Sequence, residues 1–178
     1  RQYYRALRSS FSQEQFHAWN QALANPLLAV GKTLPVGGLV AVYRARGKEA
    51  NLSSLYGLPL RFCFPRVLPG GEMEFREADP KDSKAFVPGP FGLEEPSEAC
   101  RIVGAGEIDA CFIPLLAFDG SGTRLGHGMG HYDRFLAAFR GKRIGVGFEW
   151  QFSPLRLPEQ THDQRLHLAV TEHGIRRF

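Results

Sequence analysis

The feature that most constrains the fold is a continuous apolar run at residues 110–118, which leads into a glycine-rich stretch. A strand that is apolar at every position must be covered on both faces, as the strands of parallel sheets are. In the stretch that follows, Gly126, Gly128 and Gly130 alternate with other residues, and residues 134–139 have a helical pattern. This order predicts a buried strand, a turn, a glycine loop and a helix.

The rest of the chain alternates between strand-like and helix-like segments. Strands are expected at residues 37–46, 60–67, 72–77, 111–118, 143–149 and 168–171. Helices are expected at residues 2–24, 49–56 and 134–139. Ser12 and Gln15 have capping-box spacing and predict a break in the first helix near residues 9–12, and Pro65 is expected to end the second strand.

This alternation predicts an α/β fold. We expect a single domain over residues 1–178, with a mostly parallel, twisted sheet flanked by helices in a Rossmann-like three-layer arrangement.

Residues 78–98 are rich in proline, glycine and acids, and this long irregular segment is expected to shape a site. Ligands of such folds bind beyond the carboxyl ends of the strands, which is where the glycine loop is expected.

Composition and charge narrow the class of protein. A formal net charge of +4 favours anionic ligands, but the basic residues form no continuous run, so we expect no nucleic acid as a partner. Cys63, Cys100 and Cys111 are widely spaced, which is typical of free thiols in a reducing compartment. No segment has the length of a membrane span and no signal peptide opens the chain, so a cytoplasmic protein without a membrane partner is expected.

The glycine loop has the features of an anion site. A helix start offers free backbone N–H groups, and glycines let an anion come close to them. Arg124 and Arg134 lie on either side of the loop and supply positive charge. The spacing fits neither the P-loop nor the dinucleotide-binding fingerprint, so the local pattern alone leaves a structural turn open beside a phosphate site.

The full string R-L-G-x-G-x-G-x-Y-D-R at residues 124–134 resembles the signature of the 5-formyltetrahydrofolate cyclo-ligase family. Further segments resemble the family in the same order: LRSSFS at 7–12, residues 40–55, FPRV at 64–67, MEFR at 73–76, GPFGLEEP at 89–96, PLLAFD at 114–119, HD at 162–163 and AVTE at 169–172. The resemblance covers nearly the whole chain. It implies an enzyme that uses ATP and Mg²⁺ to convert 5-formyltetrahydrofolate to 5,10-methenyltetrahydrofolate, with small molecules as its partners.

The resemblance also implies roles for individual residues. The expected ATP-binding residues are Arg1, Arg124, Leu125, Gly126, His127, Gly128, Met129, Gly130, His131 and Tyr132. The expected magnesium ligands are Asp133 and Asp163, and the expected folate-binding residues are Tyr43, Arg44, Glu49 and Phe91. If Leu125 anchors the loop to the core, Arg124 is expected to project toward the ATP phosphates.

Local sequence alone leaves a plainer interpretation open for several of these residues. Asp133 is also placed to act as a helix N-cap, and Asp163 as an acid of a surface loop. Glu49 is also typical of the first turn of a helix, and Phe91 of a loop anchor. Arg1, Arg5 and Arg8 also fit a solvated basic helix face.

One departure from the family pattern bears on function. The family commonly has Asp-Thr two positions after its folate-pocket glutamate, whereas this chain has Asn51 and Leu52. This leaves open a non-catalytic relative that binds folate or nucleotide. A sugar-phosphate protein is a second alternative, but no acid–base constellation for a sugar is found. A monomer or a weak dimer is expected.

Overall fold

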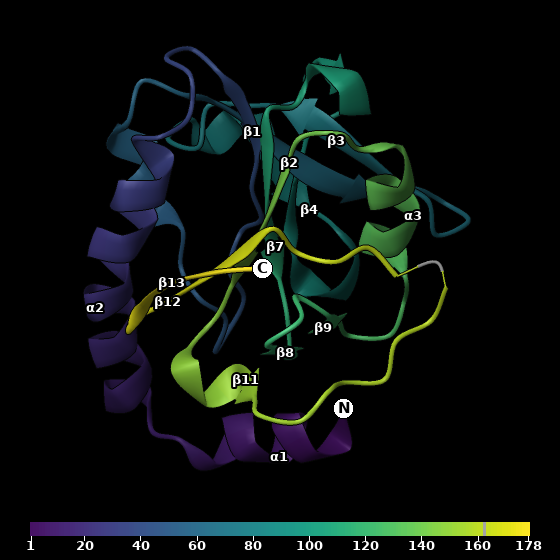
Figure 1. Cartoon of the computed structure of the whole chain (residues 1–178). Helices are drawn as coiled ribbons and strands as arrows, with labels where there is room; N and C mark the ends of the chain where they lie inside the picture. The colour runs from purple at the N-terminus through teal and green to yellow at the C-terminus, as the bar shows by residue number, and fades with distance from the viewer. Residues whose placement is uncertain (162) are drawn as a thin grey trace.

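The computed structural model describes residues 1–161 and 163–178, apart from the side chain of Phe91 (Figure 1). In these ranges the α-helices are α1 (Gln2–Ser10), α2 (Gln13–Gly31) and α3 (His131–Ala138). The strands are β1 (Leu39–Ala41), β2 (Arg61–Val67), β3 (Met73–Glu77), β4 (Phe86–Pro88), β5 (Glu94–Pro96), β6 (Ile102–Val103), β7 (Ala110–Pro114), β8 (Ala117–Asp119), β9 (Arg124–Leu125), β10 (Lys142–Val146), β11 (Phe152–Ser153), β12 (Leu168–Thr171) and β13 (Gly174–Arg177).

The main sheet has eight strands in the order β13-β12-β10-β7-β1-β2-β3-β6. The strands from β12 to β2 run parallel to their neighbours, and antiparallel strands complete both edges. The predicted α/β fold with a mostly parallel sheet is confirmed. The antiparallel edge strand β13 was missed, because its sequence is rich in arginine and has no apolar run.

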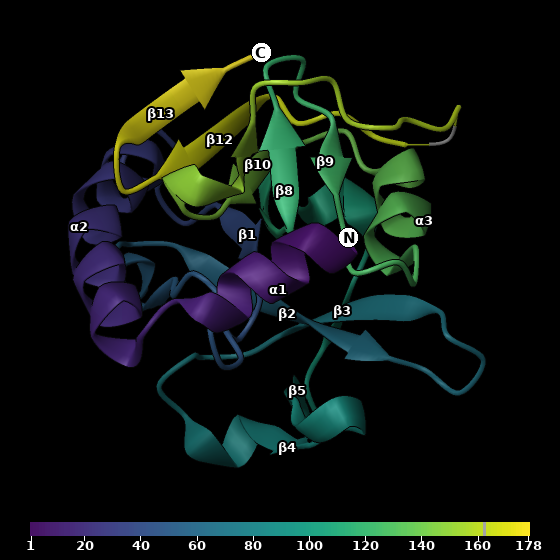
Figure 2. The same ribbon diagram turned by 90° about the horizontal axis from the view of Figure 1, so that it is seen from below.

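Both faces of this sheet are covered. Val40 and Val42 pack into a core cluster with Leu23 and Leu27 of α2, whereas Ala41 belongs to a second cluster on the side of α3. Successive side chains of a strand point to opposite faces, so a continuous apolar run fills two cores. Figures 1 and 2 show α2 and α3 on opposite sides of the sheet, which is the expected three-layer arrangement.

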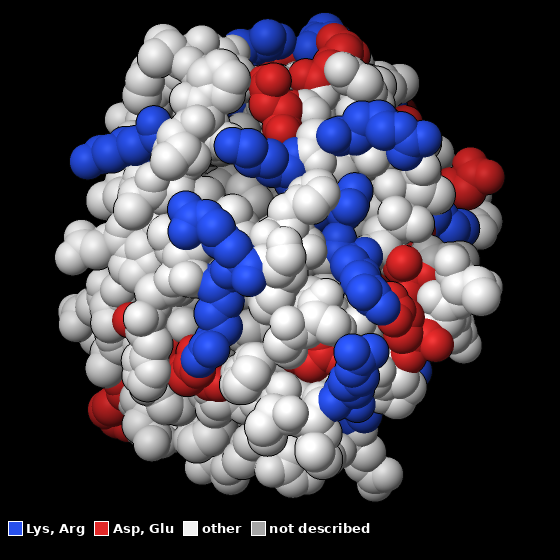
Figure 3. All heavy atoms as spheres, in the orientation of Figure 1, with Lys and Arg blue, Asp and Glu red and all other residues white. Residues whose placement is uncertain are grey.

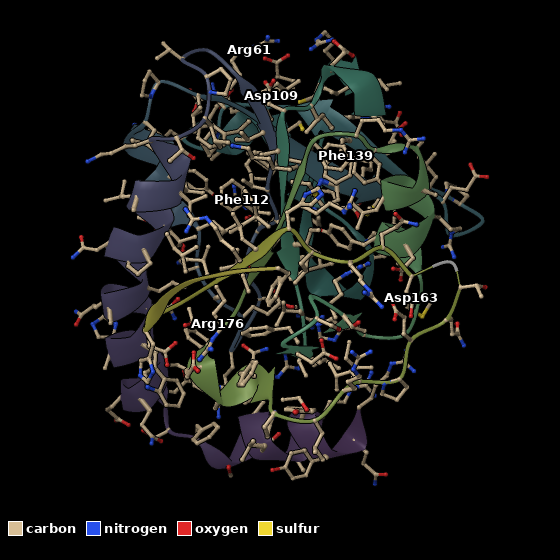
Figure 4. All side chains as sticks on the ribbon, in the orientation of Figure 1. Arg61, Asp109, Phe112, Phe139, Asp163 and Arg176 are labelled. Atoms are coloured by element: carbon tan, nitrogen blue, oxygen red, sulfur yellow. The ribbon has the colours of Figure 1, made fainter. Side chains whose placement is uncertain are left out.

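The carboxyl ends of the parallel strands lie at the lower end of Figure 1. Asp109, just before β7, is at the opposite end in Figure 4, so β7 runs toward α1. Helix α1 crosses this lower end together with a small sheet of order β11-β8-β9. Because β9 leads directly into the glycine loop, the small sheet places that loop beside the strand ends.

The first helical segment divides as expected. The Gln15 carboxamide oxygen accepts from the Ser12 N–H at 2.8 Å, and Ser12 Oγ accepts from the Gln15 N–H at 3.2 Å, which completes the capping box. Helix α2 then continues past residue 24 to Gly31, although it contains Pro26. Leu27 is fully buried and extends the buried face of α2, so packing on the sheet outweighs the cost of the proline.

Two predicted elements of the first half are wrong. Residues 49–56 form no α-helix but end in a short 3₁₀ turn at Ser53–Gly57. The Asn51 side chain accepts from the Ser53 N–H at 2.7 Å, and such a side-chain bond competes with helix formation. Pro65 does not end β2, which continues to Val67. β1 pairs with β2 only as far as Cys63, so beyond that residue the side of β2 toward β1 needs no backbone N–H donor. A proline, which lacks an N–H, is therefore tolerated there.

The predicted strand at residues 111–118 is in fact two strands. The chain leaves the main sheet after Pro114, and residues from Ala117 onward join the small sheet as β8. The Gln151 side chain donates to the carbonyls of Leu115 and Leu116, at 2.6 and 3.2 Å, where the chain changes sheets. An apolar pattern does not show such a break, because both strands are buried.

Candidate functional site

The glycine loop lies between β9 and α3. Gly128 has a φ of 106° and Gly130 a φ of 67°, a left-handed conformation that favours glycine. Gly130 is the N-cap of α3, and no side chain caps the helix there. The first N–H groups of α3 therefore remain available to a ligand. The alternative of Asp133 as N-cap is wrong, since Asp133 lies inside the first turn.

Helix α1 lies against this loop. Arg1 Nε donates to the Gly126 carbonyl at 3.2 Å, and Arg5 Nη2 donates to the His127 carbonyl at 2.8 Å. Both side chains are exposed, but each has a specific contact, so this face is more than a solvated basic surface. Arg5 was not among the predicted site residues. Its spacing of four from Arg1 was the available signal, because that spacing puts both on one helix side.

Arg124 occupies a different place from the one expected. Its side chain is only 4% exposed, and its Nη2 donates to Asp133 Oδ1 at 2.5 Å. Its Nη1 donates to the Gln164 carbonyl at 2.6 Å. The guanidinium thus joins the first turn of α3 to the segment next to Asp163, and it does not project freely from the loop. It brings together the two regions that carry the predicted metal ligands.

The contacts of Asp133 and Asp163 show whether their carboxylates could bind a metal ion. Asp133 has one oxygen on Arg124 and a side chain that is 26% exposed. Asp163 accepts from the Gln160 N–H at 2.8 Å, and Figure 4 shows it close to α3. Over 1–161 and 163–178, no three His, Cys, Asp or Glu side chains form a metal-binding group. A magnesium ion here would therefore need phosphate oxygens as further ligands, which is common for Mg²⁺.

The remaining residues of the glycine loop contact different parts of the protein. Leu125 pairs with Ala117 in the small sheet, so the backbone anchors the loop there, while the Leu125 side chain is half-buried. Met129 is 61% exposed. His131 Nδ1 lies 2.8 Å from the Gly71 carbonyl, which also accepts from Arg134 Nη2 at 2.8 Å. The turn between β2 and β3 is thereby joined to the start of α3.

Three of the predicted folate residues lie after β1. The Tyr43 hydroxyl donates to the Ala50 carbonyl at 2.8 Å, and burial raises the pKa of Tyr43 well above its usual value. Glu49 Oε1 lies 3.4 Å from His127 Nε2 of the glycine loop, and Glu49 Oε2 accepts from the Arg46 N–H at 2.9 Å. Glu49 therefore faces the loop and begins no helix, so the plainer interpretation of a helix-start acid is wrong.

Arg44 contacts the β4–β5 segment, which also carries Phe91. Arg44 pairs with Glu94 at 2.7 Å and lies over the ring of Phe86, 4.2 Å from its centroid. Phe91 has its backbone in the turn Pro90–Gly92, and its side chain is outside the described part of the structure. Segment 78–98, expected to be irregular, forms the small sheet of β4 and β5.

A narrow pocket lies among these residues. Its lining includes Tyr43, Lys48, Glu49, Pro114 and Gln151, so it opens at the carboxyl ends of β1 and β7. Its volume is about 10 Å³, which is the space of about one water molecule. A larger ligand could enter only if neighbouring parts move.

Tyr132 connects the two halves of the site. Burial, together with the neighbouring Cys111, Tyr43 and Glu49, raises the pKa of Tyr132 well above its usual value, against the opposing effect of Arg124. Tyr132 is therefore a neutral phenol at physiological pH. Glu49 of the region after β1 lies 3.4 Å from His127 of the glycine loop, so the loop predicted for ATP and the residues predicted for folate lie next to each other.

Positive charge is not gathered into one stripe on the face seen in Figure 3, where lysine and arginine side chains form separate groups among uncharged and acidic residues. No helix in the described ranges is long and apolar enough to cross a membrane.

The fold and the loop define an α/β protein with an uncapped glycine loop beyond the carboxyl ends of a parallel sheet. A model of the 5-formyltetrahydrofolate cyclo-ligase family matches residues 1–172, and the chain belongs to this family. It is 37% identical over 146 residues to the 5-formyltetrahydrofolate cyclo-ligase of Mycolicibacterium smegmatis, a match that covers 80% of this chain and 64% of that relative. The matches span less than two thirds of the length of the curated relatives.

Solved structures agree with this assignment. The 5,10-methenyltetrahydrofolate synthetase of Aquifex aeolicus is similar with a TM-score of 0.79 and 28% identity, covering 99% of this chain and 89% of that chain. The 5,10-methenyltetrahydrofolate synthetase from Mycoplasma pneumoniae has a TM-score of 0.74 at 21% identity, covering 94% of this chain and 93% of that chain, and supports the fold.

Proposed function

We propose that the protein is an ATP- and Mg²⁺-dependent 5-formyltetrahydrofolate cyclo-ligase that forms 5,10-methenyltetrahydrofolate, ADP and phosphate. The observation that carries this proposal is the contact between Glu49 and His127, which joins a folate-type pocket to an uncapped glycine loop. Transfer of a phosphoryl group from ATP to folate requires such closeness. We propose that the whole chain acts as one domain, as a monomer or weak dimer in the cytoplasm.

The nucleotide would bind at the glycine loop. Its phosphates would meet the first N–H groups of α3 and the guanidinium groups of Arg1 and Arg5. Both arginines donate to neutral carbonyls of the loop, and a phosphate is a stronger acceptor than a carbonyl. Binding of ATP would therefore exchange weak contacts for charged ones.

The magnesium ion would be held by Asp133 and Asp163 together with phosphate oxygens. The Oδ2 oxygen of Asp133 suits this role, because Arg124 engages Oδ1. When bound, the ion would neutralise developing charge on the phosphates. Arg124 would then serve mainly to orient Asp133 and the segment of Gln164.

The folate would lie with its pterin toward Glu49 and Tyr43. A carboxylate accepts hydrogen bonds, so Glu49 suits the amino edge of a pterin. The half-buried, neutral Tyr132 would close the wall between pterin and phosphates. The departure at Asn51 and Leu52 does not argue against catalysis, since Leu52 is 1% exposed and Asn51 accepts from Ser53, which are structural roles.

The reaction then follows from position. The formyl oxygen of the substrate attacks the γ-phosphorus of ATP, and ADP leaves with the electron pair of the broken P–O bond. Nitrogen 10 attacks the activated formyl carbon and loses its proton, and the C–O bond breaks to release phosphate. The chain's residues orient the two substrates and neutralise phosphate charge.

The decisive experiment measures the absorbance of 5,10-methenyltetrahydrofolate during turnover. Product is expected when 5-formyltetrahydrofolate, ATP and Mg²⁺ are all present, and ADP should appear in equal amount. Omission of ATP, or chelation of Mg²⁺, should abolish it. Equal product without ATP would refute the ligase, and binding of both ligands without turnover would favour a non-catalytic relative.

A further inference from the structure

Helix α1 buries none of its own residues in a core. The apolar contact at its C-terminal end comes from Phe11, which follows the helix and packs against Phe16, Trp19 and Trp150. At its N-terminal end, Arg1 and Arg5 donate to carbonyls of the glycine loop. An element held in this way can shift at little cost, because few buried contacts are lost.

The other end of α1 is held by Lys48. Its Nζ donates to the carbonyls of Arg8 at 3.4 Å, Ser9 at 3.3 Å and Phe11 at 2.5 Å. Carbonyls at the end of a helix lack partners within the helix, and a cation is favoured there. The lysine also lies 5.3 Å from the ring centroid of Phe16, at the start of α2. Lys48 is thus the polar anchor at the C-terminal end of α1, beside the apolar contact of Phe11.

These contacts close a ring of three segments. Arg1 and Arg5 join α1 to the glycine loop, the pair of His127 and Glu49 joins the glycine loop to residues 46–49, and Lys48 joins residues 46–49 back to α1. One segment belongs to the proposed nucleotide site and another to the proposed folate site.

We propose that Lys48 is a positioning residue that couples the binding of ATP to the binding of folate through α1. The inference rests on the proposed function. Phosphates would draw Arg1 and Arg5, and therefore α1, toward the glycine loop. Through Lys48 this movement would set the position of Glu49 and the narrow pocket, which Lys48 itself lines. Folate bound at Glu49 would hold α1 in the same way, because coupling is reciprocal.

The test measures this coupling directly. The Kd of a non-hydrolysable ATP analogue with Mg²⁺ is measured by calorimetry with and without saturating 5-formyltetrahydrofolate. In the wild type, folate is expected to lower this Kd roughly fivefold or more. In Lys48→Met, which keeps the apolar stem but removes the donors, the ratio should fall toward one. Lys48→Arg, which keeps a cation, should restore part of it.

The control is Lys142→Met, since Lys142 is exposed and lies at the start of β10, at the other end of the sheet. This variant should keep the wild-type ratio. A Lys48→Met protein that binds each ligand more weakly but with an unchanged ratio would show a merely structural lysine and overturn the proposal. A wild-type ratio near one would overturn it as well.

A second measurement needs no ligand. Trypsin cleavage after Arg8, followed by mass spectrometry, reports how firmly α1 is held. Lys48→Met should release the N-terminal peptide several times faster than Lys142→Met, with the rest of the protein still folded by its thermal melt. Equal rates would refute Lys48 as the anchor. Wild-type protein that binds neither ligand would refute the proposed function instead, while the cleavage rates still test the anchor.

Discussion

The contact between Arg124 and Asp133 gives the sharpest test of the site. Arg124→Ala removes a donor to Asp133 Oδ1 at 2.5 Å and a donor to the Gln164 carbonyl at 2.6 Å. A hydrogen bond to a charged group contributes roughly 1.5–3 kcal/mol, and a neutral one about 1 kcal/mol. Water reaches Asp133, whose side chain is 26% exposed, and offsets part of the loss. We therefore expect a destabilisation of about 2–3 kcal/mol.

Thermal unfolding and urea titration measure this loss. At roughly 2–4 °C per kcal/mol for a chain of this size, Tm should fall by about 4–12 °C. Turnover should fall as well: kcat/KM for ATP should drop on the order of 10- to 100-fold, because Asp133 loses its orientation. Arg124→Lys should recover part of both, since a lysine cannot reach two acceptors with a planar fork.

A double-mutant cycle with Asp133→Asn separates the pair from its surroundings. The two substitutions should be coupled by about 1 kcal/mol or more, as expected for groups in contact. Arg156→Ala is the matched control, because Arg156 is exposed, and it should stay within about 0.5 kcal/mol of wild type. Additive effects of Arg124→Ala and Asp133→Asn, or a stability loss no larger than that of the control, would refute this reasoning.

Two further substitutions test the loop and the small sheet. Gly128→Val should abolish binding of the ATP analogue in a folded protein, because Gly128 has a φ of 106° and an added Cβ would lie 3.6 Å from Arg1 Nε. Gly120→Ala, which meets no atom within 4 Å, is its control, and retained affinity in Gly128→Val would mean a structural loop. Asp119 tests pH dependence: burial opposes its charge, but bonds from Leu157, Ser121 and Thr123 keep its pKa below the usual value. A depressed pKa in the folded state stabilises the protein above the unfolded value of about 3.9, and this stabilisation is lost as pH falls through the folded pKa. Asp119→Asn should therefore be less stable than wild type in urea at pH 7, with a difference that shrinks as the pH falls below the unfolded pKa. A stability difference that does not change with pH would contradict this expectation.

The sequence by itself determined the fold class and the order of most elements. Continuous apolar runs at β1 and β7 require cover on both faces, and this requirement depends only on local composition. It also determined the capping box at Ser12 and the position of the glycine loop, because caps and tight turns are set by residues a few positions apart. The family likeness, read from the string at residues 124–134, was confirmed.

The tertiary structure decided what depends on contacts between distant residues. The Gln151 side chain donates hydrogen bonds to the carbonyls of Leu115 and Leu116, at the point where one apolar run divides into two strands. Arg124 is turned toward Asp133 and Gln164, the latter forty positions away along the chain. Such contacts are set by the packing of whole elements, which no local pattern encodes.

The same holds for the ring of α1, the glycine loop and residues 46–49. Arg5 and Lys48 carry no motif, and only the docking of α1 across the strand ends gives them partners. The chemistry of the glycine loop predicts which residues can bind phosphate, and the family resemblance predicts which residues can bind folate. Which of them meet in one site follows from the topology of the sheet, which brings the carboxyl ends of its parallel strands to one edge.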